Sequence, residues 1–223
     1  MRFCAASDQA LLIYFGDEIG LAAHDEVFKL LRSLQKYPPA WLRNLQPAYT
    51  SLMVSFDLCQ IDHGNVEAEI RRIAGCRKRR RPPKTRLVEI PVCYGDEFGP
   101  DLDEVARLHG LRQPDVIAMH TSPIYHAYFL GFAPGFAYLG EVPEQIATPR
   151  LETPRRELPA GSVAIAEKQT AVYPFSTPGG WRLIGRTPVL MFQTDRTPMS
   201  TIAIGDSVKF HAISRRQFLD TQL

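Results

Sequence analysis

The chain has 223 residues, of which 45% are hydrophobic and 22% charged, with a formal net charge of +2. This composition is typical of globular cores and excludes a disordered or fibrous chain, and the length suits one large domain or two small ones. Nine of the 26 Lys and Arg residues lie between Arg71 and Arg86 without any acidic residue, which leaves 17 basic residues against 24 acidic ones elsewhere. The basic character is therefore confined to one segment.

Residues 1–80 predict a small α+β domain. Apolar residues at Val27, Leu30, Leu31 and Leu34 have helical spacing, and Pro38 follows where this helix would end. Gly/Pro punctuation and apolar alternation suggest the remaining elements. The predicted order is β-α-β-β-α, with a strand at 10–16, a helix at 20–37, two strands within 41–57 and a helix at 65–75.

The segment 76–86, CRKRRRPPKTR, separates this domain from the rest of the chain. A run of like charges that contains Pro-Pro is extended and solvated, so we interpret it as an interdomain linker. The alternative is a patch for nucleic acid. Because no aromatic residue is interleaved with the charges, we favour the linker and expect no nucleic-acid partner.

Residues 86–223 predict a second domain, rich in β-structure. A strand at 86–95 precedes short helices at 101–110 and 114–120, and a closing strand is expected at 205–213. Between them, residues 131–188 hold 7 of the 15 glycines and 8 of the 18 prolines. Short strands with such dense turn residues are typical of a closed or sandwiched β domain.

Several common signatures are missing from the sequence. It contains no G-x-x-x-x-G-K-[ST] phosphate loop, no H-E-x-x-H and no G-x-S-x-G. The four cysteines, Cys4, Cys59, Cys76 and Cys93, form no C-x-x-C pair, which argues against a zinc ribbon or redox motif. We expect no metal site, no membrane association and a cytoplasmic protein with reduced thiols.

Four segments carry unusual side chains among glycines. In MHTSPIY, His120 can act as a general base or as a buried structural histidine. In LGFAPGFAYLG, Tyr138 is a polar group that either contacts a substrate or anchors the loop. In PAGSVAIAEKQTAVYP, Gln169 and Tyr173 are neutral hydrogen-bonding groups that suit an amide, although they are also ordinary at a strand edge.

The fourth segment, TPGGWRLIGRTP, combines backbone access with a flat wall and a cation. Gly179 and Gly180 permit close approach of the backbone, and Trp181 presents an aromatic surface. Arg186 can hold a carboxylate or phosphate through a bidentate bond, or can lie at a barrel rim without a ligand. These patterns locate a candidate site without naming a reaction.

Seven motifs, taken in their order along the chain, resemble those of one family. They are PVCYGDEFGPDLDEVA, LGFAPGFAYLG, TPR, PAGSVAIA, QTAVYP, STPGGWRLIGRTP and GDSVKF. It is the family of the B subunits of bacterial 5-oxoprolinase, also called allophanate hydrolase subunit 1, which includes an inhibitor of a sporulation kinase. The resemblance implies an α+β fold: a small N-terminal domain, then a cyclophilin-like β-barrel. Prolyl isomerase activity does not follow from that barrel, because fold and function separate.

The resemblance also implies a function. Together with an A subunit, and with a C subunit of related barrel fold, such a chain hydrolyses 5-oxo-L-proline to L-glutamate with ATP as co-substrate. We expect no activity from the chain without these partners. The alternatives within the family are a regulatory protein that inhibits a sensor histidine kinase, or a subunit of an allophanate or urea amidolyase-type hydrolase.

Carried over by motif, the residues fall into two groups. Catalytic roles are expected for His120, Gln169, Tyr173 and Arg186. Gln169 and Tyr173 would hydrogen-bond the lactam, and Arg186 would hold the carboxylate or a phosphorylated intermediate. His120 would transfer a proton. Substrate contact is expected for Phe136, Tyr138, Gly179, Gly180 and Trp181.

This chain departs from the family pattern near one motif. Glu167 and Lys168 stand where family members commonly have small residues, and Ala171 stands where they have glycine. We expect these changes to place charges beside the site.

Overall fold

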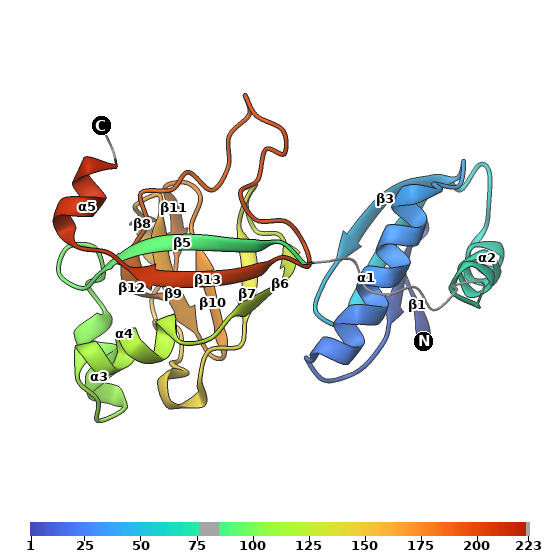
Figure 1. Ribbon diagram of the computed structural model, residues 1–223. Coiled ribbons are helices and arrows are strands. Elements are labelled where there is room, and N and C mark those ends of the chain that lie inside the picture. Colours follow the sequence, from blue (N-terminus) through green and yellow to red (C-terminus); the bar gives the residue numbers. More distant parts are fainter. Residues whose placement is uncertain (76–84, 222–223) are drawn as a thin grey trace. The chain divides into compact units, whose positions relative to one another are not determined.

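The computed structural model describes residues 1–75 and 85–221 and divides into two compact units, Met1–Lys84 and Thr85–Leu223. Figure 1 shows a sheet with helices in the first unit and a barrel with peripheral helices in the second. Most of the predicted linker, residues 76–84, lies outside the described residues. The expected α+β class with a closed β-barrel is confirmed.

The first unit is an antiparallel four-stranded sheet of order β1-β2-β4-β3. Its elements are β1 Arg2–Ser7, β2 Ala10–Tyr14, α1 Leu21–Lys36, β3 Leu42–Pro47, β4 Ser51–Phe56 and α2 His63–Gly75. The helix face predicted for α1 is confirmed, since Val27, Leu30, Leu31 and Leu34 are all buried. The predicted order lacked β1, which pairs with β2 from Arg2↔Tyr14 onward.

The second unit closes seven strands into a barrel of order β10-β7-β6-β13-β5-β12-β9. The strands and helices are β5 Leu87–Tyr94, α3 Leu102–Leu108, α4 Gln113–Thr121, β6 Tyr125–Leu130, β7 Ala137–Gly140, η1 Glu144–Ile146, β8 Arg155–Leu158, β9 Ser162–Ala166, β10 Gln169–Val172, β11 Thr177–Gly179, β12 Arg182–Arg186, β13 Ser207–Ala212 and α5 Arg215–Asp220. Strands β8 and β11 form a separate two-stranded sheet.

Strand β9 shows how the barrel supports two apolar layers. All five of its residues are buried, and successive side chains point to opposite faces of a strand. Val163 and Ile165 belong to the main barrel core, whereas Ala164 and Ala166 belong to a second cluster with Phe136, Tyr173 and Trp181. The small alanines on this face leave room for large aromatic rings.

Two further sets of contacts attach helices α3 and α5 to the rest of the barrel unit. Asp101, at the start of α3, accepts two bonds from Arg155 (2.8 and 2.6 Å) and one from the Leu183 N–H (2.7 Å). The sequence did not predict α5, which packs Phe218 on Phe98 at a ring distance of 4.6 Å.

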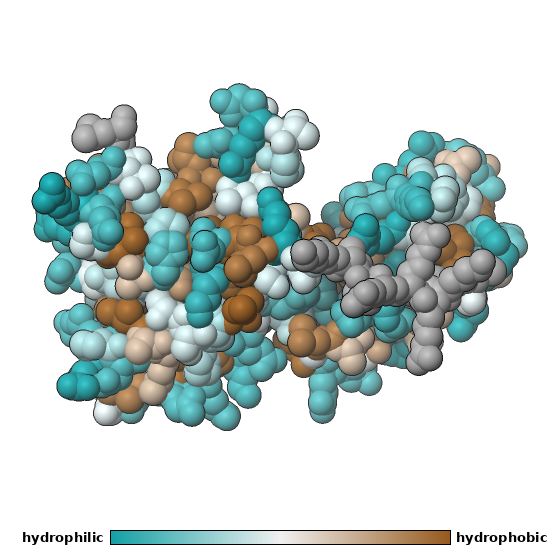
Figure 2. All heavy atoms as spheres, in the orientation of Figure 1, coloured by the Kyte–Doolittle hydropathy of each residue, from teal (hydrophilic) through white to brown (hydrophobic). Residues whose placement is uncertain are grey.

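Figure 2 shows hydrophobic residues among hydrophilic ones on the visible face of this unit, and Phe132, Leu190 and Met199 are among its exposed apolar side chains.

Candidate functional site

The loop between β6 and β7 forms one side of the candidate site. Gly135 has φ +82°, and a Cβ there would lie 2.8 Å from Phe192 Cβ, so the position requires glycine. The Gly131 N–H donates to the Phe136 carbonyl (3.1 Å), which closes the loop. As a result Phe136 is buried, whereas Phe132, at φ 70°, stays 61% exposed.

Phe136 is the centre of an aromatic cluster on the outer face of the barrel. Its ring centroid lies 5.0 Å from Tyr138, 5.2 Å from Tyr173 and 5.7 Å from Trp181, all in edge-to-face geometry. Such pairs contribute about 0.5–1.5 kcal/mol each beyond simple burial. These contacts therefore hold the four rings in fixed positions relative to one another.

A cavity of about 130 Å³ lies against this cluster. Its lining residues are Phe132, Phe136, Tyr138, Arg150, Tyr173, Gly179, Gly180 and Trp181. Six of the nine predicted site residues are thus brought together: Phe136, Tyr138, Tyr173, Gly179, Gly180 and Trp181. Their contact with a substrate stays a prediction.

The two adjacent glycines differ in what surrounds them. A Cβ on Gly179 would lie 2.6 Å from both the Tyr173 hydroxyl and Leu158 Cδ1. A Cβ on Gly180 would meet nothing closer than Pro154 Cγ at 3.5 Å, an ordinary contact. Gly179 therefore allows Tyr173 to lie against the backbone of β11, as expected for a backbone that must approach closely.

The phenols at the cavity remain protonated near neutral pH. Burial raises the pKa of Tyr173 to about 12, opposed by a bond from the Trp181 backbone and by the positive charge of Arg150. Burial likewise raises the pKa of Tyr138, and Arg150 again opposes the shift. Both hydroxyls are therefore neutral groups that can donate and accept hydrogen bonds.

His120 does not line the cavity; it is fully buried between α4 and the barrel. The Thr170 hydroxyl donates to the Ala164 carbonyl (2.9 Å), so it accepts from His120 Nε2–H (2.9 Å). Nδ1 then accepts from the Tyr94 hydroxyl (2.8 Å). Burial lowers the pKa of His120 to about 3, which fits a neutral structural imidazole.

Gln169 and Arg186 also lie outside the cavity lining. Gln169 begins β10, half-buried, and is paired with Ala166 and Gly140. Arg186 Nε donates to the Ala160 carbonyl (2.8 Å), and its guanidinium lies 6.0 Å from the Phe218 ring centroid. The predicted roles of these two side chains therefore have no support from the cavity.

The charges at Glu167 and Lys168 are likewise not part of the lining. Both residues are exposed at the turn between β9 and β10, and Lys168 Nζ lies 3.7 Å from Glu144. Ala171 is buried in the aromatic cluster. The departures from the family pattern thus leave the cavity wall unchanged in charge.

Two lining residues, Phe132 and Arg150, were not predicted from the sequence. The Arg150 guanidinium lies 5.7 Å from the Trp181 ring centroid. Arg150 belongs to the motif TPR, residues 148–150, which contributed to the family resemblance but to which no role in the site was assigned. Phe132 and Phe136 stand in the same Gly-Phe-Ala context in the sequence, so the position of Phe132 at the cavity is visible only in the structure.

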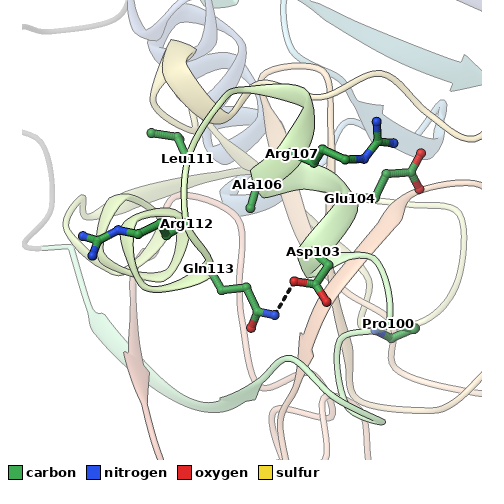
Figure 3. A pocket seen from close by; sticks show the side chains of 8 residues that line it. All are labelled: Pro100, Asp103, Glu104, Ala106, Arg107, Leu111, Arg112 and Gln113. Atoms are coloured by element: carbon green, nitrogen blue, oxygen red, sulfur yellow. Dashed lines mark hydrogen bonds between the residues drawn. The ribbon is translucent and has the colours of Figure 1, made fainter.

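A larger hollow of about 720 Å³ lies on α3 and α4 (Figure 3). Its lining includes Asp103, Glu104, Arg112 and Gln113. Figure 3 shows Gln113 bonded to Asp103, and Glu104 pairs with Arg182. Arg112 pairs with Asp115, so all four of these polar groups already bind side chains of this chain. Because no aromatic residue lines this hollow, we assign the candidate site to the smaller cavity.

Within residues 1–75 and 85–221, no three His, Cys, Asp or Glu side chains gather as a metal ion would require. No helix in the same described segments is long and apolar enough to cross a bilayer.

Comparisons with known proteins identify the family. The family described as "Carboxyltransferase domain, subdomain C and D" matches residues 1–202. The chain is 42% identical to the B subunit of Bacillus subtilis 5-oxoprolinase, over 95% of this chain and 92% of that protein. The chain belongs to the family of 5-oxoprolinase B subunits. The resemblance inferred from the motifs is thereby confirmed.

Solved structures support the same fold. The crystal structure of TTHA0988 is similar with a TM-score of 0.83 and 34% identity, over 93% of this chain. The present chain spans only 40% of the length of TTHA0988. Kluyveromyces lactis urea amidolyase is similar with a TM-score of 0.79 over 98% of this chain and 15% of that one. At 16% identity, that likeness concerns the fold alone.

Proposed function

We propose that the chain is the B subunit of an ATP-dependent 5-oxoprolinase, which hydrolyses 5-oxo-L-proline to L-glutamate together with the A and C subunits. The observation that carries the proposal is the 42% identity to the Bacillus subtilis B subunit over 95% of the chain. The aromatic cavity is the site that this chain would contribute.

The size of the cavity favours a small ring over a nucleotide. A cavity of about 150 Å³ in another protein holds one benzene molecule, whereas drug-sized ligands need roughly 300 Å³ or more. At about 130 Å³, this cavity suits a single five-membered ring. We therefore assign the lactam to this chain and the nucleotide to another member of the complex.

The reaction needs ATP because a lactam is a poor electrophile. Transfer of the γ-phosphoryl group to the lactam oxygen would make the ring carbon susceptible to attack by water. ADP leaves in the transfer, and after the first water attacks, the C–N bond breaks to give glutamyl phosphate. A second water hydrolyses this acyl phosphate and releases glutamate and phosphate. In this chain we assign the hydrogen bonds to the amide to the neutral hydroxyls of Tyr138 and Tyr173, which line the cavity.

Association with another protein is also consistent with the surface of the barrel unit. Phe132, Leu190 and Met199 are each at least half exposed. Exposed apolar side chains suit a surface that a second protein covers. We propose that the C subunit provides this cover.

The proposal is tested by mixing the purified chain with the A and C subunits from the same genome, ATP and 5-oxoproline, and measuring glutamate. We expect glutamate only from the complete mixture, and none when this chain is omitted. Parallel reactions with allophanate test the alternative substrate. If the other two subunits form glutamate with the Bacillus subtilis relative but not with this chain, the proposal is wrong.

A further inference from the structure

The polar groups of the cavity are unevenly distributed. Its lining consists of aromatic rings, two glycines and Arg150, whose guanidinium is the sole formal charge among the lining residues. A neutral ring needs no such cation. The cavity therefore matches a ligand that joins a compact ring to an anionic group.

Arg150 differs from the other arginines near the site. Arg155 pairs with Asp101, Arg182 pairs with Glu104, and Arg186 donates to the Ala160 carbonyl. Arg150 forms no ion pair with any carboxylate in the described part of the chain. It is exposed, and its guanidinium lies over the ring of Trp181. A guanidinium resting on an aromatic face keeps its planar donors available for a carboxylate.

The backbone on both sides of Arg150 is held in place. Arg182 Nε donates to the Pro149 carbonyl (3.2 Å), and the Leu151 N–H donates to the Gly180 carbonyl (2.7 Å). Gly180 itself lines the cavity. These two bonds fix the position of Arg150 relative to the aromatic wall, so its side chain starts from a defined point at the cavity.

We infer that Arg150 is the specificity-determining residue of the site, binding the carboxylate of the substrate while Phe136, Tyr173 and Trp181 contact its ring. The substrate class is a small cyclic amide with a carboxylate on the ring. This inference rests on the proposed function and assigns to Arg150 the anion role first expected for Arg186. It predicts that the site binds 2-pyrrolidinone, the same lactam without the carboxylate, more weakly than 5-oxoproline.

The kinetic test compares Arg150→Gln with Arg156→Gln in the reconstituted complex. Arg156 is an exposed arginine on β8 and outside the cavity lining, which makes it a matched control. Loss of a charge-assisted pair is expected to raise KM for 5-oxoproline on the order of tenfold to a hundredfold in Arg150→Gln. The inhibition constant of 2-pyrrolidinone should stay unchanged, and Arg156→Gln should behave as wild type. An unchanged KM in Arg150→Gln overturns the inference.

A binding test separates this inference from the proposed function. The full chain is titrated with 5-oxoproline while the indole N–H signal of Trp181 is followed by NMR, with Trp41→Phe used to assign the two tryptophans. We expect the signal to shift on titration of wild type, and we expect the dissociation constant for 5-oxoproline to be at least tenfold higher in Arg150→Gln. Such binding without glutamate formation would retain the inference and refute the proposed function. No binding to wild type, or equal binding to both proteins, would refute the inference.

Discussion

Gly179 offers a quantitative test of how the cavity is built. In Gly179→Ala the new methyl would lie 2.6 Å from the Tyr173 hydroxyl and 2.6 Å from Leu158 Cδ1. Overpacking of this kind costs about 1–3 kcal/mol, which corresponds to a fall in Tm of roughly 4–12 °C for a domain of this size. Because the tyrosine must move, we also expect slower glutamate formation by the reconstituted complex.

Gly180→Ala is the matched control. Both substitutions remove a glycine from the same segment, so their effects on the unfolded chain cancel in the comparison. At Gly180 the methyl would meet Pro154 Cγ at 3.5 Å, and we expect a change within about 0.5 kcal/mol. Thermal and urea unfolding of the two variants give the difference directly. Equal stability of the two variants would refute the close packing of Gly179 on Tyr173.

A double substitution locates the clash. Tyr173→Phe removes the hydroxyl that lies 2.6 Å from the new methyl, while the contact with Leu158 remains. Gly179→Ala should therefore cost less in the Tyr173→Phe background, with a coupling free energy of at least about 0.5 kcal/mol. Additive effects would show that the hydroxyl is not the obstructing group.

Two stability predictions concern buried polar groups. Since burial holds the pKa of His120 near 3, the unfolded chain takes up a proton first as the pH falls below about 6.5. Wild type should then lose about 1.4 kcal/mol of unfolding free energy between pH 7.5 and 5.5 relative to His120→Gln; parallel profiles would contradict a neutral His120. Asp101→Asn weakens the bonds to Arg155 and should lower the free energy of urea unfolding by about 2–3 kcal/mol, a moderate loss because the arginine is partly exposed. Asp103→Asn, at an exposed position, should leave this free energy nearly unchanged. Equal losses in the two variants would contradict a stabilising role of the Asp101–Arg155 pair.

Local patterns predicted most of the fold, and the misses have physical causes. Helix α1 buries its predicted face because its periodicity is local and strong. Strand β1 was missed because its side chains are almost all exposed, so no alternation marks it, and it forms through pairing with β2. Helix α5 is six residues long and is stabilised by the packing of Phe218, which depends on tertiary structure.

The candidate site was only partly predictable. Glycines and aromatic residues within turn-rich motifs are visible in a sequence, and those predicted here do gather at one cavity. Burial and pairing are not visible. The sequence could not show that His120 is enclosed by Tyr94 and Thr170, nor that Arg186 is bonded to a carbonyl while Arg150 is not paired with a carboxylate of the described segments.

The aromatic cavity of this chain is proposed to hold the lactam substrate of a 5-oxoprolinase. A crystal structure of the assembled complex with 5-oxo-L-proline would locate the ring. We predict that the ring lies against Phe136, Tyr173 and Trp181 with its carboxylate on Arg150. Density for the ring at any other site, with this cavity empty, would contradict the claim.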